Sequence, residues 1–184
     1  SSIVAVATDF PAVSRPWLRY AAENDCSVHF VEDIASENLT TRLIAGIDAH
    51  TSVVAVSCVQ FSTGSVVDVP RLREACGRVG ARLVIDATQA AGLLKVDSQR
   101  WKADAVVTSG YKWLGGHGGV ALSAVSAGLL EQDPLLPGWF GTNSPFHFEA
   151  TSLPFAASAR RFTQSTMSYI SMAGLATAID QLLP

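Results

Sequence analysis

The stretch RLVIDATQAAGLLKVDSQRWKADAVVTSGYKWLGGHGGVAL, residues 82–122, contains two short apolar runs that each end in polar residues. Residues 82–86 and 103–108 have the length and the branched side chains typical of buried strands, and a short helical segment is expected between them near residues 98–102. Continuous apolar strands that alternate with helices are typical of a parallel sheet covered on both faces. The stretch therefore predicts an α/β fold with a mainly parallel sheet and flanking helices.

The same alternation extends over the preceding part of the chain. Three further strands are expected over residues 3–8, 27–32 and 52–57, and residues 118–123 have the pattern of one more. Three helices are also expected: one with Ser14 as N-cap, Pro16 in its first turn and an end near Glu23; one over about residues 39–49; and one from an Asp68 cap to Gly80.

The regular alternation ends after residue 123. Residues 135–156 contain three of the eight prolines and several aromatic residues without periodicity, which is typical of a long ordered loop. A last helix is expected from about residue 167 to residue 183. Its spacing predicts a core-facing stripe made of Ile170, Ala173, Ala176, Ile179 and Leu183.

The composition excludes several classes of protein. The 184 residues are 48% hydrophobic and 16% charged, which fits one packed domain or one layer of a larger one. A net charge of -3 provides no basic surface, and no apolar run approaches the roughly 20 residues of a membrane helix, so neither nucleic acid nor membrane is expected as a partner. Three widely spaced cysteines fit a reducing cytoplasm. The chain lacks an initiator Met, and we expect a piece of a longer protein.

Polar side chains follow two neighbouring strands of the predicted sheet. Asp86 and Gln89 come after residues 82–86, and Ser109, Tyr111 and Lys112 come after the next strand. Ligands of open α/β sheets lie at the carboxyl ends of the strands. Each residue alone is typical of a turn, a cap or a solvated charge, but together they match pyridoxal phosphate catalysis, in which a lysine amine forms a Schiff base and a carboxylate pairs with the pyridinium nitrogen.

The sequence around these residues resembles the class V aminotransferase-fold enzymes (fold type I), which include cysteine desulfurases and kynureninases. The matching pieces are SCVQFSTG at 57–64, IDATQAAG at 85–92 and TSGYKWLGGHGGVAL at 108–122. The resemblance implies that Lys112 is the Schiff-base lysine and that Asp86 is the partner of the ring nitrogen. It further implies that Gln89 contacts the phenolic oxygen of the cofactor and that Ser109 and Tyr111 contact its phosphate.

Two further cofactor contacts are expected near other strand ends. Phe10, followed by Pro11, is similar to the family segment whose aromatic ring stacks on the cofactor. Ser57 opens the first matching piece and is a candidate contact. The alternatives are that Phe10 is an aromatic residue of the core or of an interface and that Ser57 only caps a strand.

The C-terminal part carries weaker resemblances. Trp139, in the sequence GWFG, resembles the kynureninase residue that reaches the neighbouring subunit's cofactor; the alternative is an aromatic residue of the core or of an interface. Residues 160–166, RRFTQST, resemble a family run R-F-E-x-G-T whose last residue binds phosphate across a dimer interface, which implies this role for Thr166. Thr163 and Ser165 depart from that run.

The resemblance implies an enzyme that acts on a small amino-acid substrate. A class V aminotransferase or a cysteine desulfurase-like lyase is favoured by Gln89, whereas Tyr111, GWFG and residues 59–61 favour a kynureninase-like hydrolase. A non-catalytic relic or assembly domain is the alternative outside enzymes. Family members also have an N-terminal helical portion and a C-terminal small domain, so residues 1–184 are expected to form part of the cofactor-binding large domain and to be inactive in isolation.

The loop at residues 135–156 also predicts an assembly. Its aromatic residues are of the kind enriched at interface cores. In the resembling family, equivalent segments cross a two-fold axis, which implies a homodimer in which Trp139 and Thr166 approach the other subunit's cofactor. The aromatic residues concerned are Trp139, Phe140, Phe146, Phe148 and Phe155.

Overall fold

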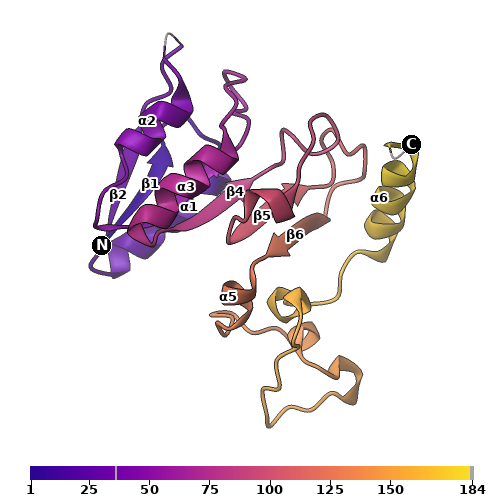
Figure 1. Ribbon diagram of the computed structural model, residues 1–184. Helices are drawn as coiled ribbons and strands as arrows, with labels where there is room; N and C mark the ends of the chain where they lie inside the picture. Colours follow the sequence, from indigo (N-terminus) through magenta and orange to yellow (C-terminus); the bar gives the residue numbers. More distant parts are fainter. Residues whose placement is uncertain (36, 183–184) are drawn as a thin grey trace.

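A six-stranded sheet organises the protein, whose computed structural model describes residues 1–35 and 37–182 (Figure 1). The strand order is β2-β1-β3-β4-β5-β6, and every neighbouring pair is parallel except β5 and β6, which are antiparallel. The mainly parallel sheet confirms the predicted fold class. The strands are β1 (Ser2–Val6), β2 (Ser27–Val31), β3 (Thr51–Ser57), β4 (Arg82–Asp86), β5 (Ala105–Ser109) and β6 (Ala121–Val125).

Helices cover both faces of the sheet. The chain moves from β1 to β2 in one direction along the sheet and from β2 through β3 to β4 in the other, so right-handed crossovers place α1 opposite α2 and α3 (Figure 1). The helices are α1 (Pro11–Glu23), α2 (Leu39–Ala45), α3 (Val69–Val79), α4 (Ser98–Trp101), α5 (Ala127–Leu130) and α6 (Tyr169–Leu182), with 3-10 turns η1 (Trp139–Gly141), η2 (Pro145–His147) and η3 (Ala159–Phe162).

The main hydrophobic core lies between the sheet and the α2–α3 face. Alternate residues of the central strands point into it, and α2 and α3 supply the opposing side chains because their apolar residues recur at helical spacing. This core makes the strand ends rigid supports for any side chain that follows them. Its fully buried members include Val4, Val6, Val54, Val56, Leu83, Ile85, Leu43, Leu72 and Cys76.

The start of α1 differs from the prediction. Ser14 is not the N-cap and Pro16 is not in the first turn, because the helix begins at Pro11 with Phe10 as its N-cap residue. Pro11 suits the first helical position, where an N–H group would lack an intrahelical partner in any case. Pro16 therefore lies inside the helix. The earlier start brings the first turn of α1 directly onto the end of β1.

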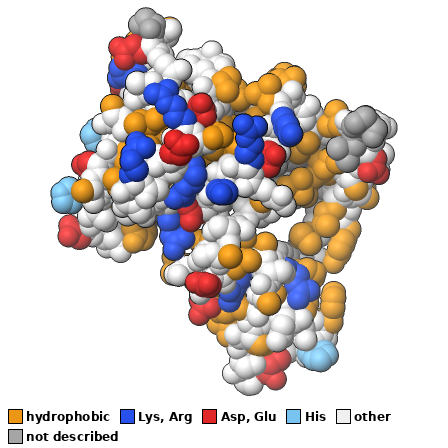
Figure 2. Space-filling view, viewed as in Figure 1, with side chains coloured by type: hydrophobic (Ala, Val, Ile, Leu, Met, Phe, Trp, Pro, Cys, Tyr) orange, Lys and Arg blue, Asp and Glu red, His pale blue; other side chains and the backbone are white. Residues whose placement is uncertain are grey.

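The face that α6 buries also differs from the prediction. Ser171 and Leu175 are buried, whereas Ile170 is 85% exposed and Ala173 and Ala176 are exposed. Ile179 is partly buried as expected, and Leu183 lies outside the described residues. The helix has this orientation because Leu175 packs against Gly110 and Gly116, and much of its remaining apolar surface is exposed (Figure 2).

Other boundaries differ by a few residues. α2 ends at Ala45 rather than near residue 49, because Gly46 follows and packs close to Val31, where an added Cβ would lie 3.1 Å from the Val31 Cγ2 atom. β6 covers Ala121–Val125 rather than residues 118–123. Residues 135–156 form the expected irregular segment, apart from the two short turns η1 and η2. In the described part of the chain, no helix has the length and apolar character needed to cross a membrane.

Candidate functional site

The carboxyl ends of β1, β3, β4 and β5 meet around a pocket of about 110 Å³. The pairing of Ser57 with Asp86 between β3 and β4 aligns two of these ends. The pocket brings together seven residues that the sequence singles out: Phe10, Ser57, Asp86, Gln89, Ser109, Tyr111 and Lys112. Sequence reasoning missed three others that line it, Ala12, Phe61 and Thr88.

Asp86 is fixed by the turn that follows β4. Its Oδ1 atom accepts a hydrogen bond from the Thr88 N–H group at 2.7 Å, and the Thr88 hydroxyl accepts one from the Ser109 N–H group at 3.0 Å. Thr88 therefore connects the ends of β4 and β5 through hydrogen bonds. Among the described residues the Asp86 Oδ2 atom has no hydrogen-bond partner, which leaves one oxygen free for a ligand. A hydroxyl residue two positions after a strand-ending Asp is the signal that could have identified Thr88.

Asp9 is a second carboxylate at this edge, and the sequence analysis missed it. It is 6% exposed, and its oxygens accept from the Ser57 N–H group at 2.7 Å, the Ser57 hydroxyl at 2.6 Å and the Gln60 amide at 3.2 Å. It also accepts from the Phe10 N–H group at 2.7 Å. These bonds join the end of β1 to the end of β3 and so place both Phe10 and Ser57 at the pocket.

Replacing Asp9 by alanine is expected to lower the free energy of unfolding by about 3 kcal/mol, because the buried donors of Ser57 and Gln60 would lose their acceptor. Urea unfolding of the full-length protein measures the change. Asp25→Ala is the control, since Asp25 is exposed. Equal unfolding midpoints for the two variants would show that the Asp9 bonds do not hold the strand ends.

Aromatic rings form one wall of the pocket. Phe10 and Phe61 meet edge to face with ring centroids 5.4 Å apart. This geometry is favourable for aromatic pairs. Phe61 comes from the loop after β3, so the wall joins the same two strand ends that Asp9 connects.

Lys112 lies on a loop closed by its own backbone, residues 110–116, which we call the lysine loop. The Gly116 N–H group donates to the Gly110 carbonyl at 2.9 Å, and the Lys112 Nζ atom lies 5.3 Å from the centroid of the Tyr111 ring. The lysine loop packs against Leu175 of α6. A Cβ added at Gly110 or Gly116 would lie 2.9 or 2.8 Å from the Leu175 side chain. Only glycine permits this close approach.

Cys58 follows Ser57 but is not a nucleophile. Burial, together with the negative charges of Asp86 and Asp9, raises the pKa of its thiol to about 12. The thiolate is the reactive form of cysteine, so this thiol is protonated and inert at neutral pH. Lys112, by contrast, lines the pocket and carries an amine there.

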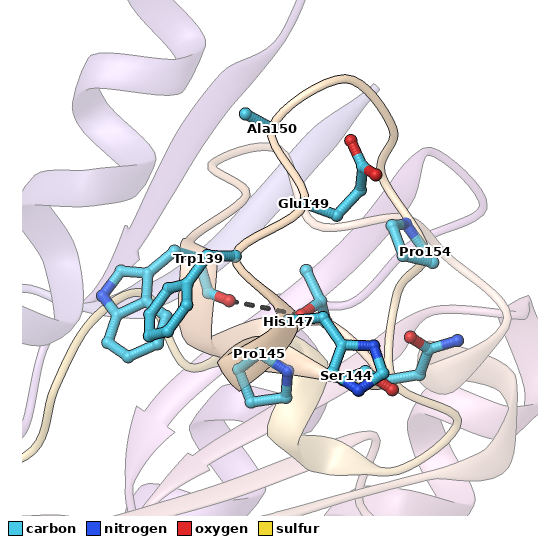
Figure 3. A pocket seen from close by; sticks show the side chains of 10 residues that line it. Trp139, Ser144, Pro145, His147, Glu149, Ala150 and Pro154 are labelled. Carbon is cyan, nitrogen blue, oxygen red and sulfur yellow. Dashed lines mark hydrogen bonds between the residues drawn. The ribbon is translucent and has the colours of Figure 1, made fainter.

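Trp139 and Thr166 are not brought to this pocket. Trp139 lines a larger cavity of about 550 Å³ within the irregular segment, together with His147, Phe148 and Glu149 (Figure 3). Its carbonyl accepts a hydrogen bond from the Thr142 hydroxyl at 3.3 Å, drawn as the dashed line in Figure 3. Thr166 is exposed and lines neither cavity.

The run that carries Thr166 nevertheless passes close to Trp139. A Cβ added at Gly138 would lie 1.9 Å from the Gln164 carbonyl oxygen, so the two backbones are in direct contact. Trp139, Phe140, Phe146 and Phe148 form a cluster of edge-to-face and stacked rings, which we call the aromatic cluster. Phe146 and Phe148 are 66% and 73% exposed. The cluster is therefore an apolar surface on this chain.

The pocket combines an amine, a free carboxylate oxygen, an amide and hydroxyl groups beside an aromatic wall. These groups can bind an aromatic, anionic molecule and can attack an electrophilic carbon with the amine.

The family model described as Aminotransferase class-V matches residues 1–183. The uncharacterized aminotransferase YcbU of Bacillus subtilis is 30% identical over 181 residues, which cover 98% of this chain and 47% of that protein. The kynureninase of Eremothecium gossypii is 31% identical over 154 residues, which cover 77% of this chain and 33% of that protein.

A solved structure also matches: that of the apo cysteine desulfurase from Thermococcus onnurineus, with a TM-score of 0.83 and 26% identity over 99% of this chain and 45% of that one. This likeness confirms the expected fold type I architecture. The chain spans about half the length, or less, of the proteins it matches. Enzymes of the matched family use pyridoxal phosphate. Because the family model covers nearly every residue, the chain belongs to the class V aminotransferase family.

Proposed function

We propose that this chain is part of the cofactor-binding domain of a pyridoxal-phosphate-dependent enzyme that transforms a small amino acid. The observation that carries the proposal is the meeting of Lys112, Asp86 and Gln89 in one pocket at the strand ends. Membership of the class V aminotransferase family supports the choice of cofactor. Residues 1–184 would supply the floor and one wall of the site.

The groups in the pocket fit pyridoxal phosphate by their chemistry. The Lys112 amine suits the aldehyde, and the free Oδ2 atom of Asp86 suits the protonated ring nitrogen. Gln89 suits the phenolic oxygen, and Phe10 suits the face of the ring. Hydroxyl groups suit the phosphate, and those present in the lining are on Ser57, Thr88, Ser109 and Tyr111.

When bound, pyridoxal phosphate supplies an electron-withdrawing ring that stabilises negative charge at the Cα atom of an attached amino acid. The chain's own residues make that possible. Asp86 would pair with the ring nitrogen and favour its protonated form. The flexible side chain of Lys112 can take the proton from the substrate Cα atom with its Nζ atom. Phe10 and Phe61 would provide apolar surface on one side of the pocket.

The reaction we favour is amine transfer or a cysteine desulfurase-like cleavage. Gln89 supports this choice, and so does the 30% identity to a Bacillus subtilis aminotransferase. A kynureninase-like hydrolysis is the second candidate, supported by Tyr111, by the sequence GWFG at residues 138–141 and by the 31% identity to a kynureninase.

A panel of assays on the full-length protein tests these proposals. The assays are keto-acid-dependent amine transfer, release of sulfide or alanine from cysteine, and release of anthranilate from kynurenine. A signal in either of the first two supports the favoured reaction, and anthranilate release alone would replace it by the hydrolase. Failure of the full-length protein to bind the cofactor would instead favour a non-catalytic assembly role.

We further propose a homodimer in which the aromatic cluster, with Thr166 nearby, faces the other subunit's pocket. The exposure of Phe146 and Phe148 supports this interface, since such apolar surface is costly in water. Phe148→Asp is expected to weaken dimerisation at least about 30-fold, because it places a charge in the interface. Sedimentation of the full-length protein measures the change, with Tyr20→Asp, on the exposed face of α1, as control. A strictly monomeric, active wild-type protein would exclude the shared interface.

A reducing compartment such as the cytoplasm is the expected location. Cys26, Cys58 and Cys76 are free thiols, and Cys58 and Cys76 are buried. Free cysteines persist where the surroundings keep thiols reduced. Labelling of the full-length protein in cells would test this location.

A further inference from the structure

A hydrogen bond joins the lysine loop to the turn after β4. The Trp113 indole N–H group donates to the Gln89 Oε1 atom at 3.1 Å. Trp113 directly follows Lys112, and Gln89 lines the pocket. An indole nitrogen is a donor only, so the atom it contacts must be the carbonyl oxygen of the amide. The bond therefore fixes which end of the Gln89 side chain faces Trp113.

The two segments are also held together by their backbones. Gly92 has a φ of +93°, and a Cβ added there would lie 2.5 Å from the Trp113 carbonyl oxygen. The residues before Gly92 form a tight turn in which the Ala90 and Ala91 N–H groups donate to the Ala87 carbonyl. The indole and the amide thus extend from two segments whose separation is set independently of their side chains.

The fixed orientation leaves the Gln89 Nε2 group for the pocket. In the part of the chain that the structure describes, this NH2 group has no hydrogen-bond partner, whereas Oε1 is occupied by Trp113. An amide that presents only its N–H groups can donate a hydrogen bond to an acceptor oxygen, but it cannot accept a hydrogen bond from a hydroxyl group. The pocket is therefore biased towards a deprotonated oxygen at this position.

We propose that Trp113 is a positioning residue that holds Gln89 as a hydrogen-bond donor to the deprotonated phenolic oxygen of the cofactor. This inference rests on the proposed function. A donor to an anionic oxygen favours its ionised form and lowers its pKa. Without Trp113 the amide is free to turn over and to present its carbonyl to the same oxygen, and the ionised form loses that support.

The test is a spectrophotometric pH titration of the cofactor band in the loaded full-length protein. Trp113→Phe keeps an aromatic ring but removes the N–H donor, and it is expected to raise the titration midpoint by about 0.5 to 1 pH unit. Gln89→Glu retains an acceptor for Trp113 but places no amide donor in the pocket, so it should raise the midpoint at least as much. Trp101→Phe is the control, because Trp101 packs against the main core and removal of its indole reports only a general loss of packing.

A double variant decides whether Trp113 acts through Gln89. If it does, Trp113→Phe combined with Gln89→Leu should have the midpoint of Gln89→Leu alone. Additive shifts, or an unchanged midpoint in Trp113→Phe while Gln89→Leu shifts it, would overturn the inference and leave the proposed function intact.

Two measurements distinguish a failure of this inference from a failure of the proposed function. If the wild-type protein has no band that borohydride removes, the proposed function fails. The orientation of Gln89 is then decided by NMR, in which Gln89→Leu should move the indole N–H resonance of Trp113. An unmoved resonance would show that the bond does not form and would overturn the positioning role.

Discussion

Replacing Lys112 by alanine is expected to abolish covalent attachment of pyridoxal phosphate and to reduce turnover by about a thousand-fold or more. Lys112 is the one residue in the lining of the pocket that carries an amine. The nearby thiol of Cys58 cannot replace it, because its raised pKa keeps it protonated. The visible band of the bound cofactor, and the mass of the Lys112 peptide after borohydride reduction, measure the change.

Two further variants make that result specific. Lys95→Ala removes an exposed amine outside the pocket and should leave both the band and the turnover unchanged. Lys112→Arg keeps the positive charge but should behave like Lys112→Ala, since a guanidinium stays protonated. A reducible band that survives in Lys112→Ala would place the attachment elsewhere and refute the assignment.

Asp86→Asn is expected to lower kcat by about 100-fold to 1,000-fold while the protein still binds the cofactor. The asparagine can keep the bond that Oδ1 accepts from the Thr88 N–H group, so the turn after β4 should survive. What is lost is the negative charge that would hold a proton on the ring nitrogen. Steady-state kinetics and the cofactor content of the purified protein measure the two effects separately.

Asp97→Asn is the matched control for this change. Asp97 also accepts a backbone hydrogen bond, from the Arg100 N–H group at 3.0 Å, but it does not line the pocket. It should therefore show that loss of a capping carboxylate alone has little effect on kcat. An Asp86→Asn protein with normal turnover would mean that the pocket does not need the charge.

The strand ends were predictable because local patterns define them. The apolar runs before Asp86 and Ser109 mark where β4 and β5 end, and parallel pairing then brings both ends to one edge. The pocket lining follows from this arrangement. Asp9 could not be found in the same way, since its importance comes from bonds to Ser57, 48 positions along the chain.

The orientation of α6 shows a second limit of sequence patterns. Its apolar residues recur at helical spacing on more than one side, and spacing alone does not tell which side is buried. The buried side of α6 is determined by Gly110 and Gly116, because the absence of side chains there leaves room for Leu175. Those glycines lie in a loop far away in the sequence, so a pattern within the helix cannot report them. The position of Trp139 likewise depends on a distant contact, since Gly138 packs against the backbone of Gln164.

The strand order β2-β1-β3 has a consequence for biosynthesis. β1 pairs with β2 on one side and with β3 on the other, and its residues Ile3 to Val6 are all buried in the finished sheet. Because β3 is made much later than β1, the nascent chain must carry an apolar strand with an open edge while the ribosome completes the intervening residues. Such an exposed edge favours aggregation, and non-local parallel pairing is slow. We therefore expect the yield of soluble protein to depend on chaperones that bind β1 during translation.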